Sequence, residues 1–100
     1  MGAYRLYCFG ESGNAYKAAL MMELSEQSWF PIWVDFFNGE TRTPEYRTMV
    51  NELGEVPVLM DGRKKISQSG VILDYLAEKT GKFGPANNDE RREILRWTLF

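Results

Sequence analysis

The stretch Val56-Pro57-Val58-Leu59, followed by Ser67-Gln68-Ser69 and an apolar helical pattern, decides how this chain folds. Because proline cannot donate a hydrogen bond to a sheet ladder, Pro57 is expected at the first residue or at the edge of a strand. We expect a cis Val56–Pro57 bond, which would turn the backbone N–H and C=O of Val56 out of the sheet. An extended peptide can pair with such a free main-chain edge.

A second polar feature follows shortly after this edge. Gln68 and Ser69 stand where the apolar helical pattern begins, so they are expected at a helix N-terminus. The exposed N–H groups and the dipole at such a terminus favour a carboxylate. A peptide edge beside an anion site predicts a small acidic peptide as the ligand.

Apolar periodicity extends the prediction outward from this stretch. Strands are expected at residues 4–9, 30–37, 58–60 and 65–68, and helices at residues 14–25, 43–50 and 69–79. Thr43 and Pro44 form an N-cap and first-turn pair, Asp61-Gly62 a hairpin turn, and Gly81 a helix C-cap. The order β-α-β-α-β-β-α predicts an α/β fold with a four-stranded mixed sheet flanked by helices, because the first βαβ unit pairs in parallel.

The apolar stripes of the first two helices predict which side chains are buried. Over residues 14–25, Ala15, Ala18, Ala19 and Met22 form one stripe, and Tyr16, Leu20 and Leu24 form another, so most of that helix's circumference is expected to be buried. The next helix offers Tyr46, Met49 and Val50 as a short inward stripe.

Composition excludes several classes of function. The 100 residues are 44% hydrophobic and 26% charged with a net charge of −2, which is typical of one globular domain and gives no electrostatic case for nucleic acid or an anionic membrane. The single cysteine, Cys8, excludes a C-x-x-C dithiol site and lies in an apolar run, so it is expected to be a core thiol. The absence of histidine excludes His-dependent catalysis, and no metal site is expected.

With no signal peptide and no long apolar run, the sequence predicts a cytoplasmic protein.

The C-terminal part predicts a boundary. After Pro85 a new helix is expected from Asn87-Asn88-Asp89 onward, and its apolar Trp97 and Leu99 need another surface to cover them. We therefore expect one domain over residues 1–80, a linker over 81–88, and the first part of a truncated all-helical domain over 89–100. The alternative is a complete small domain whose last helix packs back on itself.

Four segments together carry a family resemblance. L-Y-C-F-G-E-S-G-N-A-Y-K, G-E-T-R-T-P-E-Y, N-E-L-G-E-V-P-V-L-M-D-G and S-Q-S-G-V-I-L-D-Y-L, in this order, resemble the N-terminal thioredoxin-like domain of cytosolic, serine-type glutathione S-transferases, such as theta, zeta and bacterial members. The resemblance runs from about Tyr4 to Lys79. It implies a glutathione co-substrate, an electrophile held by a helical second domain, and a homodimer.

The resemblance assigns roles to individual residues. Ser12 would donate a hydrogen bond to the sulfur of glutathione, which is worth about 1.5–3 kcal/mol, or about one to two pKa units of the thiol. The alternative for Ser12 is a helix-capping or loop serine. Asn14 could reach the same sulfur, or cap the helix, and capping is favoured. The backbone of Val56 would pair with the cysteinyl unit, with Pro57 holding that geometry.

Gln68 and Ser69 would hold the γ-glutamyl end, Ser69 at its carboxylate and Gln68 at its amine or carboxylate. The alternative is simple N-capping of the helix. One position departs from the family: serine-type members commonly carry Lys, Gln or Arg before the Val-Pro pair, facing the glycine carboxylate, whereas this chain has Glu55. Glu55 would repel that carboxylate unless it points to solvent, and Arg42 is the candidate to replace the missing cation.

Three functions follow from these assignments. The leading one is a glutathione S-transferase that activates the thiol of glutathione for attack on an electrophile. A non-catalytic module that binds or scaffolds another protein is the second, favoured by Glu55. A glutathione-dependent peroxidase or reductase is the third, and the absence of a cysteine at position 12 counts against it.

Overall fold

The computed structural model describes residues 3–99. Its elements are β1 (Tyr4–Cys8), α1 (Gly13–Leu24), β2 (Trp29–Trp33), a 3-10 turn (Glu40–Arg42), α2 (Pro44–Met49), β3 (Val58–Asp61), β4 (Lys64–Ser67), α3 (Ser69–Thr80) and α4 (Asn88–Leu99). The predicted order is confirmed, with boundaries that shift by a few residues.

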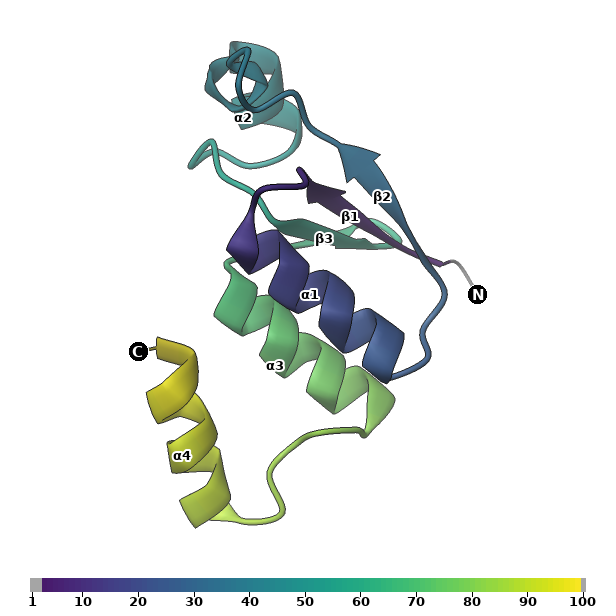
Figure 1. Cartoon of the computed structure of the whole chain (residues 1–100), viewed down its shortest axis with the longest axis vertical. Coiled ribbons are helices and arrows are strands. Elements are labelled where there is room, and N and C mark those ends of the chain that lie inside the picture. The colour runs from purple at the N-terminus through teal and green to yellow at the C-terminus, as the bar shows by residue number, and fades with distance from the viewer. Residues whose placement is uncertain (1–2, 100) are drawn as a thin grey trace.

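The four strands form one mixed sheet in the order β2-β1-β3-β4. Strand β1 pairs in parallel with β2 and antiparallel with β3, and β4 pairs antiparallel with β3. Helices α1 and α3 lie side by side on one face of the sheet, while α2 lies apart from them, across the sheet (Figure 1). This arrangement is the thioredoxin-like α/β fold that the sequence predicts.

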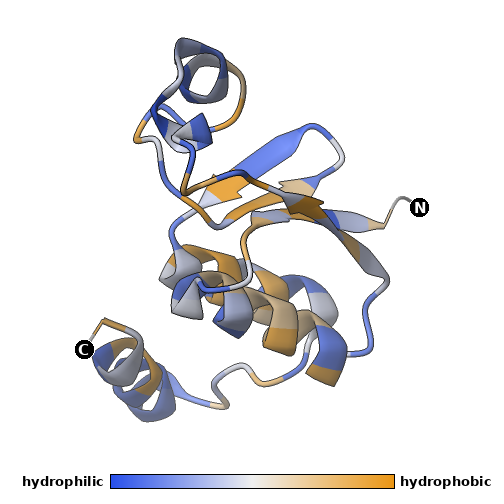
Figure 2. Ribbon diagram, turned by 45° about the horizontal axis from the view of Figure 1, so that its top comes forward, coloured by the Kyte–Doolittle hydropathy of each residue, from blue (hydrophilic) through white to orange (hydrophobic). Residues whose placement is uncertain are grey.

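The core fills the space between the sheet and the α1–α3 layer, where the hydrophobic segments of the ribbon face one another (Figure 2). Strands β1 and β3 contribute alternate side chains and the helices contribute their inner stripes. Burying a Leu, Ile or Met side chain stabilises the fold by about 1.5–3 kcal/mol. The core residues are Leu6, Cys8, Ala15, Ala18, Met22, Leu59, Ile66, Ile72 and Leu76.

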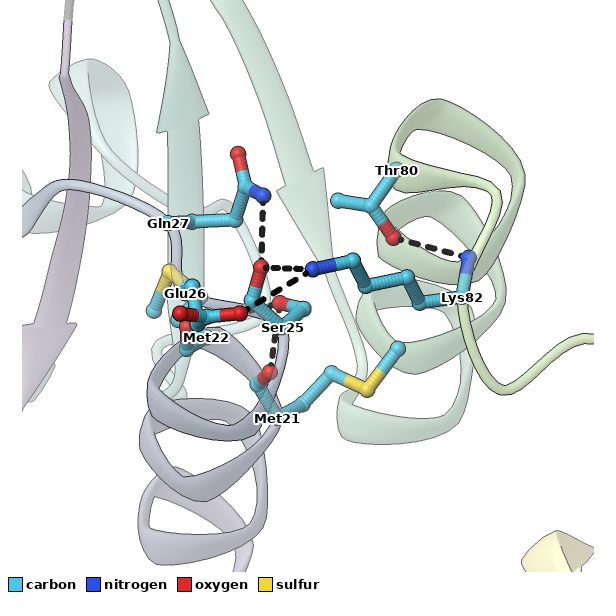
Figure 3. A network of polar contacts seen from close by, with 7 residues as sticks. All are labelled: Met21, Met22, Ser25, Glu26, Gln27, Thr80 and Lys82. Atoms are coloured by element: carbon cyan, nitrogen blue, oxygen red, sulfur yellow. Dashed lines mark hydrogen bonds and ion pairs between the residues drawn. The ribbon is translucent and has the colours of Figure 1, made fainter.

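The ends of the helices follow from local sequence chemistry. The Thr43 side chain accepts a hydrogen bond from the Tyr46 N–H, and Pro44 follows it at the first helical position, as predicted. Gly81 ends α3 with φ +70°, a left-handed conformation that glycine adopts without steric cost. Beyond that end, Lys82 contacts the carbonyl oxygen of Ser25 at 3.3 Å and the carboxylate of Glu26 at 3.5 Å, which ties α1 to the end of α3 (Figure 3).

Three predictions about strand length and packing are wrong. Strand β2 ends at Trp33 instead of residue 37, because β1 ends at Cys8 and offers no further partner. Phe36 instead stacks on Phe9, with ring centroids 4.4 Å apart. The outer stripe of α1 is exposed, since the sheet and α3 cover only the alanine face; Tyr16, Leu20 and Leu24 belong to it. Met49 is also exposed, which leaves Tyr46 as the buried side chain of α2.

Helix α4 stands off from the sheet (Figure 1) and buries none of its described residues. Its Ile94, Leu95 and Thr98 face α3 across an apolar cavity of about 200 Å³. Within residues 3–99, no helix has the length and apolar character that a bilayer crossing needs.

Candidate functional site

A small cavity of about 70 Å³ gathers residues from three separate parts of the chain. It lies between the first turn of α1, the segment before β3 and the start of α3. Its lining residues are Asn14, Glu55, Val56, Pro57, Gln68 and Ser69. The Val56–Pro57 peptide bond is cis. The structure thus brings together most of the residues to which the sequence assigns a site.

Two buried side chains hold the segment that leads into Val56. The hydroxyl of Tyr46 donates to the carbonyl oxygen of Glu55 at 2.7 Å, and the amide nitrogen of Asn51 donates to the same oxygen at 3.1 Å. Burial raises the pKa of Tyr46, so its hydroxyl stays protonated as a donor. Gly54, at φ +65°, makes the turn; a Cβ there would lie 2.7 Å from the carbonyl oxygen of Thr41.

Gln68 makes a contact that sequence reasoning missed. Its side-chain nitrogen donates to a carboxylate oxygen of Glu55 at 3.0 Å. Gln68 stands at the N-cap position of α3 with φ 73°, yet its side chain makes no capping hydrogen bond. Simple side-chain capping by Gln68 is therefore wrong. The first N–H groups of α3, beside Ser69, remain directed out of the helix end.

Glu55 is exposed, but its carboxylate does not simply point to solvent, because Gln68 holds it at the cavity. It is the one charged residue among those that line this cavity. No ion pair in the described part of the chain neutralises it.

The structure gives the cap of α1 to Ser12 and not to Asn14. The hydroxyl oxygen of Ser12 accepts the N–H of Ala15 at 3.1 Å, so Ser12 is the N-cap of α1. The preference for Asn14 as the cap is therefore wrong, and Asn14 instead lines the cavity beside Val56. The Ser12 hydroxyl keeps its own proton, since a hydroxyl can accept and donate at once.

Ser12 borders a different, mainly apolar cavity of about 170 Å³. This cavity lies between β1, α1 and the edge strand β2. Residues from these elements line it with Ser12: Cys8, Phe9, Gly10, Ala15, Tyr16, Ala19, Trp29 and Trp33. Burial raises the pKa of the Cys8 thiol, as expected for a core cysteine.

Arg42 does not line either cavity. It lies in the 3-10 turn, and its guanidinium lies against Gly39, within 2.8 Å of where a Cβ on that glycine would stand. Arg42 was considered as the cation that faces the glycine carboxylate, and it does not line the cavity that holds Glu55. Among residues 3–99, no group of three or more His, Cys, Asp or Glu side chains is arranged to hold a metal ion.

Sequence comparison identifies relatives of this fold and site. The family model "Glutathione S-transferase, N-terminal domain" matches residues 2–78. Glutathione S-transferase F10 of Arabidopsis thaliana is 40% identical over 88 residues, covering 84% of this chain and 40% of the relative. The disulfide-bond oxidoreductase YfcG of Escherichia coli is 33% identical over 99 residues, covering 92% of this chain and 46% of the relative.

Solved structures give the same result. A possible glutathione S-transferase from Rhodopseudomonas palustris superimposes with a TM-score of 0.89 at 35% identity, covering 99% of this chain and 48% of that one. Ure2p in complex with glutathione superimposes with a TM-score of 0.87 at 28% identity, covering 98% and 48%. The chain thus spans about half the length of these proteins or less, and it belongs to the glutathione S-transferase family, whose N-terminal domain it carries.

Proposed function

We propose that this chain is the glutathione-binding part of a glutathione transferase. The observation that carries the proposal is the cavity that joins the Val56 main chain to the start of α3. Val56 would pair its backbone with the cysteinyl unit, in the manner of an added strand. Ser69 and the N–H groups at the start of α3 would take the γ-glutamyl carboxylate. Relatives solved with glutathione bound support this assignment.

The thiol of glutathione would then lie at the N-terminus of α1. The Ser12 hydroxyl donates a hydrogen bond to the sulfur, while its oxygen still accepts the N–H of Ala15 as the cap of α1. Asn14, in the first turn of α1, lines the cavity and offers its side-chain amide as a second donor. Both donors and the positive end of α1 stabilise the thiolate relative to the thiol. The thiolate attacks an electrophile, forming a sulfur–carbon bond as the leaving group departs with its electron pair.

The rest of the proposal concerns the longer protein. The curated relatives are more than twice as long as the segment matched here, which supports a helical second domain that holds the electrophile. Residues 81–88 would be the linker and α4 the start of that domain. We further propose a homodimer that serves detoxification in the cytoplasm, where a lone buried thiol such as Cys8 stays reduced.

A second candidate is reduction of disulfides by glutathione. The similarity to a protein named a disulfide-bond oxidoreductase favours it. Since the chain has one cysteine, buried in the core, both reacting sulfurs would have to come from glutathione and from the substrate disulfide. A thiolate held by Ser12 and Asn14 would attack one sulfur of that disulfide and release the other as a thiolate.

Retention on immobilised glutathione tests the binding proposal. The full-length protein should be retained, and Ser69→Ala should weaken retention because the γ-glutamyl carboxylate loses a hydroxyl donor. Ser28→Ala is the matched control, since Ser28 is an exposed serine before β2, outside the cavity. Failure of the unaltered protein to bind free glutathione by calorimetry would instead favour a non-catalytic module that binds another protein.

A further inference from the structure

Glutathione has a carboxylate at each end, yet the charged side chain that lines the Val56 cavity is acidic. Glu55 is the cavity's one charged lining residue. Two cationic side chains, on β4 and α2, make hydrogen bonds to backbone carbonyl oxygens. Lys65 donates to the carbonyl oxygen of Met49, and Arg47 donates to that of Glu52. Glu55 thus brings a negative charge to the cavity, and no ion pair among residues 3–99 includes it.

The position of that charge is set by its contact with Gln68. The 3.0 Å hydrogen bond from the Gln68 amide brings the Glu55 carboxylate to the start of α3. An ionised carboxylate has two oxygens that accept about four hydrogen bonds, so this contact leaves acceptor capacity free. Ser69 and the N-terminus of α3 offer hydrogen-bond donors that suit an anion. They lie beside Glu55, whose carboxylate suits a cation.

An α-amino acid head group matches this pair, because its ammonium and its carboxylate sit on one carbon atom. In glutathione that head group belongs to the γ-glutamyl residue, and the glycine end carries only a carboxylate. A ligand placed with its head group at α3 would thus put its single positive charge within reach of the only charged side chain that lines the cavity.

We propose that Glu55 accepts the α-ammonium of the γ-glutamyl end, so that the site prefers peptides with a free α-amino head group. This inference rests on the proposed function. It reverses the expectation that Glu55 opposes the glycine carboxylate. Gln68 acts as a positioning residue, because its amide orients the Glu55 carboxylate.

The test compares two ligands and two variants of the full-length protein by calorimetry. The ligands are glutathione and N-glutaryl-cysteinylglycine, which lacks only the α-ammonium. Glu55→Gln removes the charge at nearly constant shape and should weaken glutathione binding by about two- to fivefold, the range of exposed ion pairs. The same variant should bind the glutaryl peptide as the unaltered protein does. Glu52→Gln, a matched exposed glutamate outside the cavity, should change neither affinity.

The contrary outcomes distinguish an error in the role of Glu55 from an error in the proposed glutathione-binding function. Tighter glutathione binding by Glu55→Gln, lost when the glycine carboxyl is converted to an amide, would overturn the inference and place Glu55 at the glycine end. An equal loss for both ligands would also overturn it, because the charge would then act without the ammonium. If the unaltered protein binds neither peptide, the proposed function itself fails.

Discussion

A single hydroxyl at Ser12 serves the fold and, in our proposal, the chemistry. Its oxygen accepts a hydrogen bond as the cap of α1. Its O–H can at the same time donate a hydrogen bond to the sulfur of glutathione. Ser12→Ala should lower the free energy of unfolding by about 1 kcal/mol, the usual loss for a serine N-cap. It should also raise the pKa of bound glutathione thiol, measured as thiolate absorbance against pH in the full-length protein.

Ser12→Thr separates these two effects, because threonine keeps both the cap and the hydroxyl. It should restore stability and the thiol titration together. A Ser12→Ala protein that loses stability but titrates bound thiol normally would show that Ser12 only caps α1, and Asn14 would become the donor to test next.

Tyr46 does not line the cavity, but its hydroxyl donates to the carbonyl oxygen of Glu55, which does. Tyr46→Phe deletes the 2.7 Å hydrogen bond and leaves Asn51 as the remaining donor. We expect a loss of about 1 kcal/mol in the free energy of unfolding by urea, as for a typical buried hydrogen bond. Glutathione affinity should fall as well, because the segment before Val56 loosens.

Tyr16→Phe is the control for this loss, since Tyr16 is exposed on the outer face of α1. It should leave stability unchanged within experimental error. An equal effect of the two substitutions would contradict the role given to Tyr46.

At the scale of elements, one side-chain pair joins strand β3 to helix α3. The hydroxyl of Tyr75 donates to the carboxylate of Asp61, and this hydrogen bond, with some burial, raises the pKa of Tyr75 to about 12 from its usual value of 10.0. A raised tyrosine pKa means that the folded state prefers the protonated form. Its stabilising contribution is therefore complete below pH 10 and is lost as pH rises from 10 towards 12.

Unfolding free energies of the unaltered protein and of Tyr75→Phe should consequently differ by a constant amount up to about pH 10. The difference should shrink as the pH approaches 12. Urea titrations at a series of pH values measure it. A difference that does not change over this interval would show that the pKa of Tyr75 is not raised in the folded protein.

The elements also show where sequence reasoning succeeds. Helix ends are local, so Thr43-Pro44 and Gly81 predict theirs correctly. The length of β2 is not local: its aromatic run looks like a strand, but the partner strand stops at Cys8, and the remaining rings stack instead.

The same distinction separates what the sequence predicts about the cavity from what it misses. Val56, Pro57 and Ser69 are recognisable from short motifs and do meet in the structure. The Glu55–Gln68 hydrogen bond joins side chains 13 residues apart, and neither residue type signals the other in the sequence. The hydrogen bond from Tyr46 to the carbonyl oxygen of Glu55 cannot be predicted from the sequence either, because every residue has a backbone carbonyl.

At the scale of the whole molecule, apolar side chains remain uncovered on α1 and α4. Leu24 is 58% exposed and Leu99 79% exposed. If a helical domain covers this surface, as we propose, the isolated residues 1–100 should bind an apolar dye such as ANS more strongly than the full-length protein. Equal dye fluorescence per molecule would count against that domain arrangement.

Helix α4 approaches α3 closely at Gly70, which follows Ser69 of the proposed binding site. A methyl group added at Gly70 would stand 2.7 Å from the side-chain methyl of Thr98. The absence of a side chain at Gly70 therefore lets α4 pack against the first turn of α3, where we propose that the γ-glutamyl carboxylate binds. If the proposed site is correct, a displacement of α4 would alter the packing at the start of α3, and by linkage a ligand bound there would bias the position of α4.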